Sequence, residues 1–451
     1  MKSRPIPSAY LDSDKCGACR NEQVLMTKPV KRDWTIMLYT MADQNRLRGF
    51  ANDTLLDISR ASRESRVKTV AQVTFHSSVV HPIRRYDFEE KVSAGRKRDV
   101  QNKLQFVPRK NINPPQNLVE FLHWGQRAYP AKRYCVVLQG HAWGVDYDMS
   151  SVVRAKEKRD NSWHQRVHLI LGSPGSKNHL SNKQLQDALA TASTHGKFHL
   201  LGMDSCVMGM AEIIYELHEC TEYTVAPEGL GPIRGWPFYP ILTALNKNPS
   251  SDGAALGALV LRKYSEKYRE WGGDIKLTIS LCSLRHSEEL MKAMQGLARS
   301  LREGLKAKET CSAIVSARLQ CKFIRIPTYI DLHHFCSQLK RESSVQPESS
   351  LFKACSRVET VLTRRFVQMV ALKRGRTDAF GLSIYFPKWR IGGKKRVSKW
   401  EALPWTDPMA TPSSFAEGVA KISTAYTDHE FAERSGWKEF LVEFLKARLV
   451  T

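Results

Sequence analysis

The sequence predicts an α/β fold in which a mostly parallel β-sheet is sandwiched by helices, with additional α+β elements in the C-terminal part. Continuous apolar runs such as WTIMLYTM (34–41) and YCVVLQ (134–139) are typical of strands buried on both faces. Segments of helical periodicity lie between such runs, and this alternation favours parallel strands joined by crossover helices. The chain has 451 residues, 42% of them hydrophobic, which is enough for one large domain or two ordinary ones.

The N-terminal half of the chain alternates strands and helices. The expected strands are 34–41, 67–76, 134–139, 167–172 and 198–206. The expected helices are 46–62, 115–130, 181–193 and 207–220. The helix at 181–193 opens with Ser181 and Gln184 in the spacing of a capping box, which marks its first turn.

The C-terminal half combines longer helices with fewer strands. We expect helices near 252–271, 286–306, 349–371 and 429–447, and strands at 276–284 and 379–387. Residues 1–32 are polar, contain prolines and lack periodicity, so they predict a flexible N-terminal extension. One domain should then span 33–451, with a core at about 33–250 and a C-terminal part at about 251–451.

The chain is strongly basic, since 69 Lys and Arg residues against 45 Asp and Glu residues give a formal net charge of +24. Such a charge attracts nucleic acid, anionic membranes or acidic proteins. The basic residues gather in short clusters at 154–160, 372–378 and 392–399, without interleaved aromatic residues or a nucleic-acid-binding motif. Solvated basic loops are therefore favoured over a nucleic-acid site, which stays open as an alternative.

Membrane and metal sites are not expected from this sequence. It contains no run of 18 apolar residues for a membrane-spanning helix and no apolar signal segment near the N-terminus, so the cytoplasm is the default location. Ten cysteines lack the spacing of a disulfide framework and are interpreted as reduced, buried residues. Cys16 and Cys19 form a lone CxxC pair, for which half of a metal site and a redox pair are open interpretations, but an incidental motif on a flexible tail is favoured over both.

Two residues with side chains suited to catalysis lie at the ends of predicted strands. His141 comes just after the strand at 134–139, and Cys206 ends the strand at 198–206. The carboxyl ends of parallel strands meet at one edge of a sheet, so these side chains can come together there. The helix expected after Cys206 would favour a thiolate at its N-terminal end. A thiolate beside an imidazole is the minimal nucleophile and acid pair for acyl transfer.

Asp204 lies two residues before Cys206 on the same strand, so both side chains point to the same face. A carboxylate in this position repels a thiolate electrostatically, which suggests that it serves another purpose. Binding a cationic substrate side chain is one such purpose. Capping the helix that follows is the other interpretation, because Asp is common at helix N-termini.

The chain resembles the clostripain family of cysteine peptidases, which is related in fold to caspases and gingipains. The resemblance is carried by segments in family order from residue 34 onwards. The opening strand WTIMLYTMADQNRL (34–47) is followed by VVLQGHAWG (136–144), and then by the Asp-x-Cys segment LLGMDSCVMGMAEIIYEL (200–217). Further matches are the Gly-Trp-Pro segment at 225–245, YIDLHHF (329–335) and FGLSIYFP (380–387).

The resemblance implies a cysteine endopeptidase that cleaves after Arg or Lys through an acyl-enzyme. His141 corresponds to the family's catalytic histidine and Cys206 to its nucleophile, and Asp204 to the acidic residue of the primary specificity pocket. Backbone N–H groups of Cys206 and Ala142 would hold the oxyanion. The family usually has Gly where this chain has Ala142, a change that costs about 1 kcal/mol if the position requires a positive φ.

Some relatives mature by cleavage between the catalytic His and Cys, so the chain is also expected to cut itself in this interval. The segment 151–166 is polar and offers Arg154, Lys156, Lys158, Arg159 and Arg166 as targets. No cofactor is required for the chemistry; calcium matters to some relatives, but no ligand spacing for it is recognisable here. We expect a monomer acting on protein or peptide substrates.

Two other functions stay open. The first is an inactive relative that acts as a basic binding module for nucleic acid or acidic partners. The second is a highly specific processing peptidase or a peptide ligase, because hydrolysis and ligation share the acyl-enzyme.

Overall fold

The computed structural model describes a set of ranges between residues 32 and 447. They are 32–42, 45–61, 66–75, 82–88, 104–107, 114–145, 171–172, 179–194, 196–269, 277–321, 328–372, 379–387, 426 and 429–447. The extension expected at 1–32 lies outside this part, except for Arg32, which begins the first strand.

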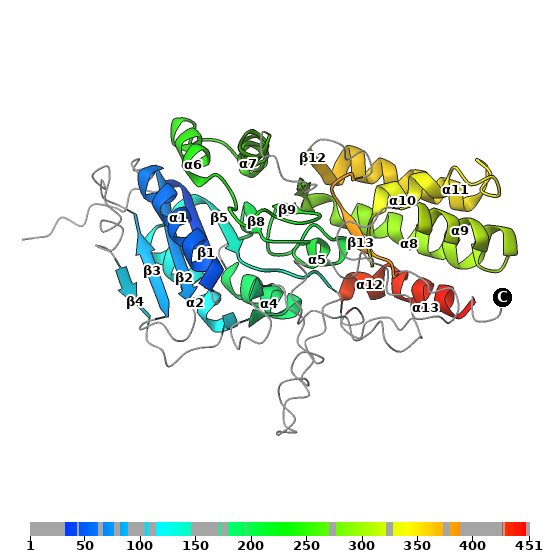
Figure 1. Cartoon of the computed structure of the whole chain (residues 1–451), viewed down its shortest axis with the longest axis horizontal. Helices are drawn as coiled ribbons and strands as arrows, with labels where there is room; N and C mark the ends of the chain where they lie inside the picture. Colours follow the sequence, from blue (N-terminus) through cyan, green and yellow to red (C-terminus); the bar gives the residue numbers. More distant parts are fainter. Residues whose placement is uncertain are drawn as a thin grey trace, which may run out of the picture. The chain divides into compact units, whose positions relative to one another are not determined.

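The main sheet of the described residues has nine strands in the order β12-β10-β9-β8-β5-β1-β2-β3-β4, most of which are labelled in Figure 1. Its five middle strands are parallel: β9 (Tyr223–Pro227), β8 (Leu200–Asp204), β5 (Ala131–Gln139), β1 (Arg32–Ala42) and β2 (Val67–Phe75). Antiparallel strands extend both margins: β10 (Thr278–Ser283), β12 (Val367–Leu372), β3 (Ile83–Asp87) and β4 (Leu104–Phe106). The predicted mostly parallel α/β sheet is confirmed.

Strand β1 is mostly apolar from Trp34 onwards because it is buried on both faces. Met37, Tyr39 and Met41 belong to one hydrophobic cluster, whereas Ile36 and Leu38 belong to a second cluster across the sheet. Such alternation between two cores follows from the two-residue period of a strand.

Helices cover both faces of the sheet. Core residues of α2 (Pro114–Ala128), α4 (Asn182–Ala192) and α5 (Ala211–Glu216) share the cluster of Met37. Core residues of α1 (Asn45–Ala61), α6 (Phe238–Lys247) and α7 (Gly253–Tyr268) share the cluster of Leu38. The capping box predicted at the start of α4 is confirmed by Ser181 and Gln184.

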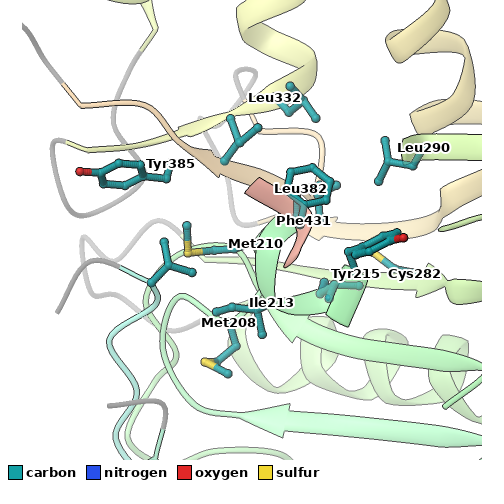
Figure 2. Packing of buried hydrophobic residues seen from close by; sticks show 14 of the residues in the cluster. Met208, Met210, Ile213, Tyr215, Cys282, Leu290, Leu332, Leu382, Tyr385 and Phe431 are labelled. Atoms are coloured by element: carbon teal, nitrogen blue, oxygen red, sulfur yellow. The ribbon is translucent and has the colours of Figure 1, made fainter. Parts of the chain in front are cut away.

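The C-terminal helices continue the core that contains α5. They are α8 (Ser287–Gly304), α9 (Lys308–Gln320), α10 (Leu332–Leu339), α11 (Ser350–Val361), α12 (Glu430–Arg434) and α13 (Trp437–Ala447). A two-stranded sheet of β11 (Tyr329–Asp331) and β13 (Ser383–Tyr385) joins them to α5, because the Tyr385 N–H donates to Glu212 Oε1 at 2.9 Å. Figure 2 shows Met210 and Ile213 in one packed cluster with Leu382 and Phe431.

Two expected elements differ from the prediction in their secondary structure or in the sheet to which they belong. The helix expected over 349–371 ends early, because 367–372 forms β12 and pairs with β10. The strand expected at 379–387 is confined to β13 and lies outside the central sheet. β13 pairs with β11 instead, and the local sequence of β13 does not indicate this partner.

Three other expectations differ in extent. Within 167–172, only β6 (Leu171–Gly172) is described, and it pairs with β7 (His179–Leu180) outside the central sheet. The helix expected at 429–447 is broken between α12 and α13 at Gly436, which has φ +71°. The helix expected from residue 207 begins only at Ala211.

No helix among the described residues is long and apolar enough to cross a membrane.

Candidate active site

The ends of β5 and β8 bring His141 and Cys206 to the same edge of the sheet. The two strands are parallel neighbours, and Gln139 pairs with Asp204 in their register. His141 follows Gln139 by two residues, and Cys206 follows Asp204 by two residues. The Gly140 N–H also donates to the Asp204 carbonyl oxygen at 3.5 Å, so the two chains are still side by side where they leave the sheet.

The turn that carries His141 is held from the C-terminal part of the chain. Tyr329 Oη donates to the Trp143 carbonyl oxygen at 3.0 Å. Gly144 has φ +76°, and a Cβ there would lie 2.7 Å from Tyr329 Oη and 2.9 Å from Met210 Sδ. Because no larger residue fits, Gly144 lets the His141 turn pack tightly against β11 and the segment before α5.

Ala142 has an ordinary backbone conformation. It is buried, and Val207 is the one non-glycine residue with positive φ in the part of the chain that the structure describes. The replacement of the family's usual glycine by Ala142 therefore carries no conformational penalty here.

The turn that carries Cys206 is strained and tied to the loop after β9. Val207 has φ +49°, an uncommon value for a β-branched residue. Its N–H donates to the Gly229 carbonyl oxygen at 2.7 Å, and the Cys206 thiol lies 3.8 Å from the Gly231 carbonyl oxygen. Cys206 is half-buried, as is Cys311, whereas the other described cysteines are buried.

The expected position of Cys206 at a helix N-terminus is wrong. Helix α5 begins at Ala211, its N-cap is Met210, and it has only six residues. The intervening residues form a loop because their backbone groups pair elsewhere: the Gly209 N–H donates to Pro227, and the Gly209 carbonyl accepts from Ser383. The dipole of α5 is therefore not placed to stabilise a thiolate at Cys206, since a helix dipole acts mainly within its first turn.

The Asp204 carboxylate is held by hydrogen bonds from two neighbouring segments. Gln139 Nε2 and the Trp236 N–H both donate to Asp204 Oδ2 at 2.9 Å. Burial raises the pKa of Asp204 to about 6, while these two hydrogen bonds and the charge of Lys267 limit the rise. The alternative that Asp204 caps the following helix is wrong, because its carboxylate faces Trp236 and not the start of α5.

The sequence did not single out the residues that hold Asp204. Gln139 also donates to Thr54 Oγ1 at 3.3 Å and accepts from Thr40 Oγ1 at 3.1 Å, which fixes its amide. Gly202 on β8 leaves room for the ring of Trp236, which a Cβ would overlap. The available signal was the position of Gln139, a polar residue that ends an otherwise apolar strand beside a candidate site.

Several residues named from the sequence lie outside the described residues. The candidate self-cleavage residues Arg154, Lys156, Lys158 and Arg159 are in a segment that is not described, and so are Cys16 and Cys19. Within the described ranges, no group of three or more His, Cys, Asp or Glu side chains could hold a metal ion.

Comparison with known proteins identifies the family. The model of the clostripain family matches residues 39–415. The chain belongs to the clostripain family. It is a cysteine peptidase with the α/β fold of that family, as the resemblance implied. No curated protein matches this clostripain-family chain.

Solved structures agree on the fold. An inactive zymogen of a C11 protease from Parabacteroides distasonis is 15% identical, with a TM-score of 0.61 over 91% of this chain and 99% of that one. A secreted C11 cysteine protease from Bacteroides thetaiotaomicron, called iotapain, is 16% identical, with a TM-score of 0.57 over 79% and 94%. A secreted C11 cysteine protease from the same organism, bound to an irreversible peptide inhibitor, is 15% identical, with a TM-score of 0.54 over 90% and 99%.

Proposed function

We propose that this clostripain-family peptidase cleaves after Arg or Lys through a dyad of His141 and Cys206. The observation that supports it best is the pairing of Gln139 with Asp204, two residues before each member of the dyad. Neighbouring strands lie about 4.8 Å apart, which is within the reach of an imidazole and a thiol. No other half-buried cysteine of the described residues follows a strand of the central sheet, since Cys311 lies on α9.

The chemistry proceeds in two steps. The Cys206 thiolate attacks the scissile carbonyl carbon, and His141 donates its proton to the leaving amine as the C–N bond breaks. Water, deprotonated by His141, then attacks the thioester and releases the acid and the Cys206 thiolate. A peptide amine in place of water gives ligation, so the acyl-enzyme alone does not distinguish the two products.

Backbone N–H groups of Cys206 and Ala142 are the proposed oxyanion donors. The ordinary φ of Ala142 is compatible with this role. The Val207 N–H is not an oxyanion donor in this proposal, because it is engaged by the Gly229 carbonyl oxygen.

Asp204 is the proposed binding partner of the basic substrate side chain. Its two hydrogen bonds converge on Oδ2, which leaves Oδ1 to receive a guanidinium or ammonium group. With a pKa of about 6 the carboxylate is ionised at neutral and alkaline pH, where such a substrate would be attracted. A desolvated charge pair of this kind discriminates against neutral side chains by several kcal/mol.

Cleavage of a peptide library tests the proposal. Wild-type protein should cut after Arg or Lys, Cys206→Ala should be inactive, and His141→Ala should lose at least about a hundredfold in kcat/KM. Cys311→Ala is the matched control, because it removes the other half-buried cysteine and should retain full activity. Substantial activity in purified Cys206→Ala would exclude the dyad.

An inactive, basic binding module is the alternative. It predicts that iodoacetamide alkylates Cys206 no faster than Cys311 and that alkylation leaves ligand binding intact. Rapid alkylation of Cys206 that abolishes cleavage excludes this alternative. Cofactor independence is part of the main proposal, and unchanged activity after treatment with EDTA or EGTA would support it.

Self-processing between the two dyad residues extends the proposal. The candidate sites Arg154, Lys156, Lys158 and Arg159 meet the proposed specificity in a segment between β5 and β8. Mass spectrometry should detect cleavage there in wild-type protein and not in Cys206→Ala. If wild-type protein cleaves added peptides under reducing conditions but stays intact, self-processing is excluded.

A further inference from the structure

One face of helix α7 borders Asp204. Tyr264, Lys267 and Tyr268 are spaced i, i+3 and i+4, so they lie on the same side of the helix. Tyr264 and Tyr268 are buried and Lys267 is exposed. Burial raises the pKa of both tyrosines, and the charge of Asp204 raises it further. All three side chains therefore lie within electrostatic range of the Asp204 carboxylate.

The turn at 234–236 separates Lys267 from Asp204. Lys267 Nζ donates to the carbonyl oxygens of Arg234 and Gly235, each at 3.0 Å, and Tyr268 Oη donates to the same Gly235 oxygen at 2.7 Å. The next N–H, that of Trp236, donates to Asp204 Oδ2. The ammonium and the carboxylate are thus bound to the same short turn through different groups, and their charges act on each other across it.

Lys267 also faces a second carboxylate. Partial desolvation of its ammonium lowers the pKa of Lys267, although the side chain as a whole is exposed; the charges of Asp204 and Asp57 oppose that shift, whereas Arg234 adds to it. Asp57 lies on α1, and Lys267 in turn opposes the rise that burial causes in its pKa. Among the described residues, two carboxylates and one guanidinium therefore act on this ammonium, which is held in place by two backbone oxygens.

We propose that Lys267 is a specificity-determining residue of the Asp204 pocket, where its fixed ammonium weakens the attraction of Asp204 for a basic substrate side chain. The inference rests on the proposed role of Asp204 in substrate binding. A substrate cation that approaches Asp204 meets the field of Lys267, so the preference for Arg or Lys is smaller than the carboxylate alone would give. At a partly solvated site, one unit charge changes binding by about tenfold.

The test compares two peptides that differ only in Arg or citrulline before the scissile bond, since citrulline is the neutral isostere of Arg. Lys267→Met should raise the ratio of kcat/KM for Arg over citrulline by about tenfold, mainly through KM. Lys267→Gln removes the charge but keeps hydrogen-bond donors for the two carbonyl oxygens, so it should raise the ratio even if the methionine variant folds poorly.

Two control variants separate charge from structure. Arg262→Met removes an exposed charge on the same helix and should leave the ratio unchanged. Tyr268→Phe removes the other side-chain hydrogen bond to Gly235 while keeping the charge, so it reports what loosening the turn does to both peptides.

The outcomes distinguish this inference from the proposed function. An unchanged or lower ratio in both Lys267 variants overturns the role of Lys267, while a wild-type ratio well above one still supports Asp204. A wild-type ratio near one that rises in the Lys267 variants shows that Lys267 masks Asp204, which supports the inference. A ratio near one in all variants overturns both.

Discussion

Gln139 and Asp204 pair across neighbouring parallel strands, and Gln139 Nε2 donates a 2.9 Å hydrogen bond to Asp204 Oδ2. The contact links the strand that leads to His141 with the strand that leads to Cys206. It also orients the carboxylate that we propose as the site for a basic substrate side chain. The geometry of the proposed dyad and that of the proposed binding site at Asp204 therefore depend on one another.

Substrate preference should change with pH around the pKa of Asp204. That pKa is about 6, because burial outweighs the hydrogen bonds from Trp236 and Gln139. As the pH falls below 6, the carboxylate is protonated and the attraction for a guanidinium is lost. The ratio of kcat/KM for Arg over citrulline peptides, measured from pH 5 to 8, should fall on the acid side. A ratio that is constant over this range would contradict the role of Asp204, and the same titration of Asp204→Asn serves as the control.

Asp204 should reduce the stability of the fold at neutral pH. Its pKa is higher in the native state than its ordinary value of 3.8, so the native state binds protons more tightly than the unfolded state. Stability therefore falls as the pH rises from about 4 to 6, and the loss persists above pH 6. Asp204→Asn should raise the free energy of unfolding at pH 8 by about 1–3 kcal/mol, and by little at pH 4. Urea unfolding of wild type and variant at both pH values measures the change in the free energy of unfolding. A variant that is less stable than wild type at pH 8 would show that burial of the ionised carboxylate does not destabilise the fold.

The sequence was sufficient to predict the centre of the fold. Strands β1 and β8 and the second half of β5 are buried on both faces, and this condition produces the mostly apolar runs from which they were predicted. The prediction that His141 and Cys206 lie at one edge of the sheet followed from the same strands, because adjacent parallel strands end at the same edge.

The margins of the sheet were not predictable in the same way. β4 has three residues, too few for a periodic signal, and β12 directly follows a helix and a short π-helical turn. Strand formation at 367–372 depends on pairing with β10, which lies about 90 residues earlier in the sequence.

The environment of Asp204 also depends on distant contacts. Lys267 and Tyr268 bind carbonyl oxygens of residues more than 30 positions away, and no motif marks such contacts. The interpretation of Cys206 as a helix N-terminal residue failed for a related reason, since the segment 207–210 pairs with the loop after β9 and with β13 instead of joining α5.

Val207 provides a test of the strained turn after Cys206. At φ +49°, a side chain with a Cβ is disfavoured by about 1 kcal/mol relative to glycine. Val207→Ala and Val207→Gly both lose the buried methyl groups, so both should be less stable than wild type. The glycine variant should nevertheless be more stable than the alanine variant by about 1 kcal/mol, the reverse of the usual order. Thermal or urea unfolding of the pair decides this, and an alanine variant that is the more stable of the two would mean that the turn is relaxed.

Gly235 provides the most specific test of the proposed binding site at Asp204, because its missing side chain leaves the space that the carboxylate occupies. A Cβ at this position would overlap Asp204 Oδ2 and would lie 3.0 Å from Gln139 Nε2. Gly235→Ala must therefore displace the carboxylate or the turn, and it should lower kcat/KM for Arg peptides by at least about tenfold.

Gly196→Ala is the matched control: Gly196 has φ +107°, but a Cβ there would meet no atom within 4 Å. Both substitutions place alanine at positive φ, which costs at least about 1 kcal/mol in stability, and more at Gly196 than at Gly235. Only the one at Gly235 should also reduce the preference for Arg over citrulline. Equal losses of activity in the two variants would show that backbone strain, and not contact with Asp204, is responsible.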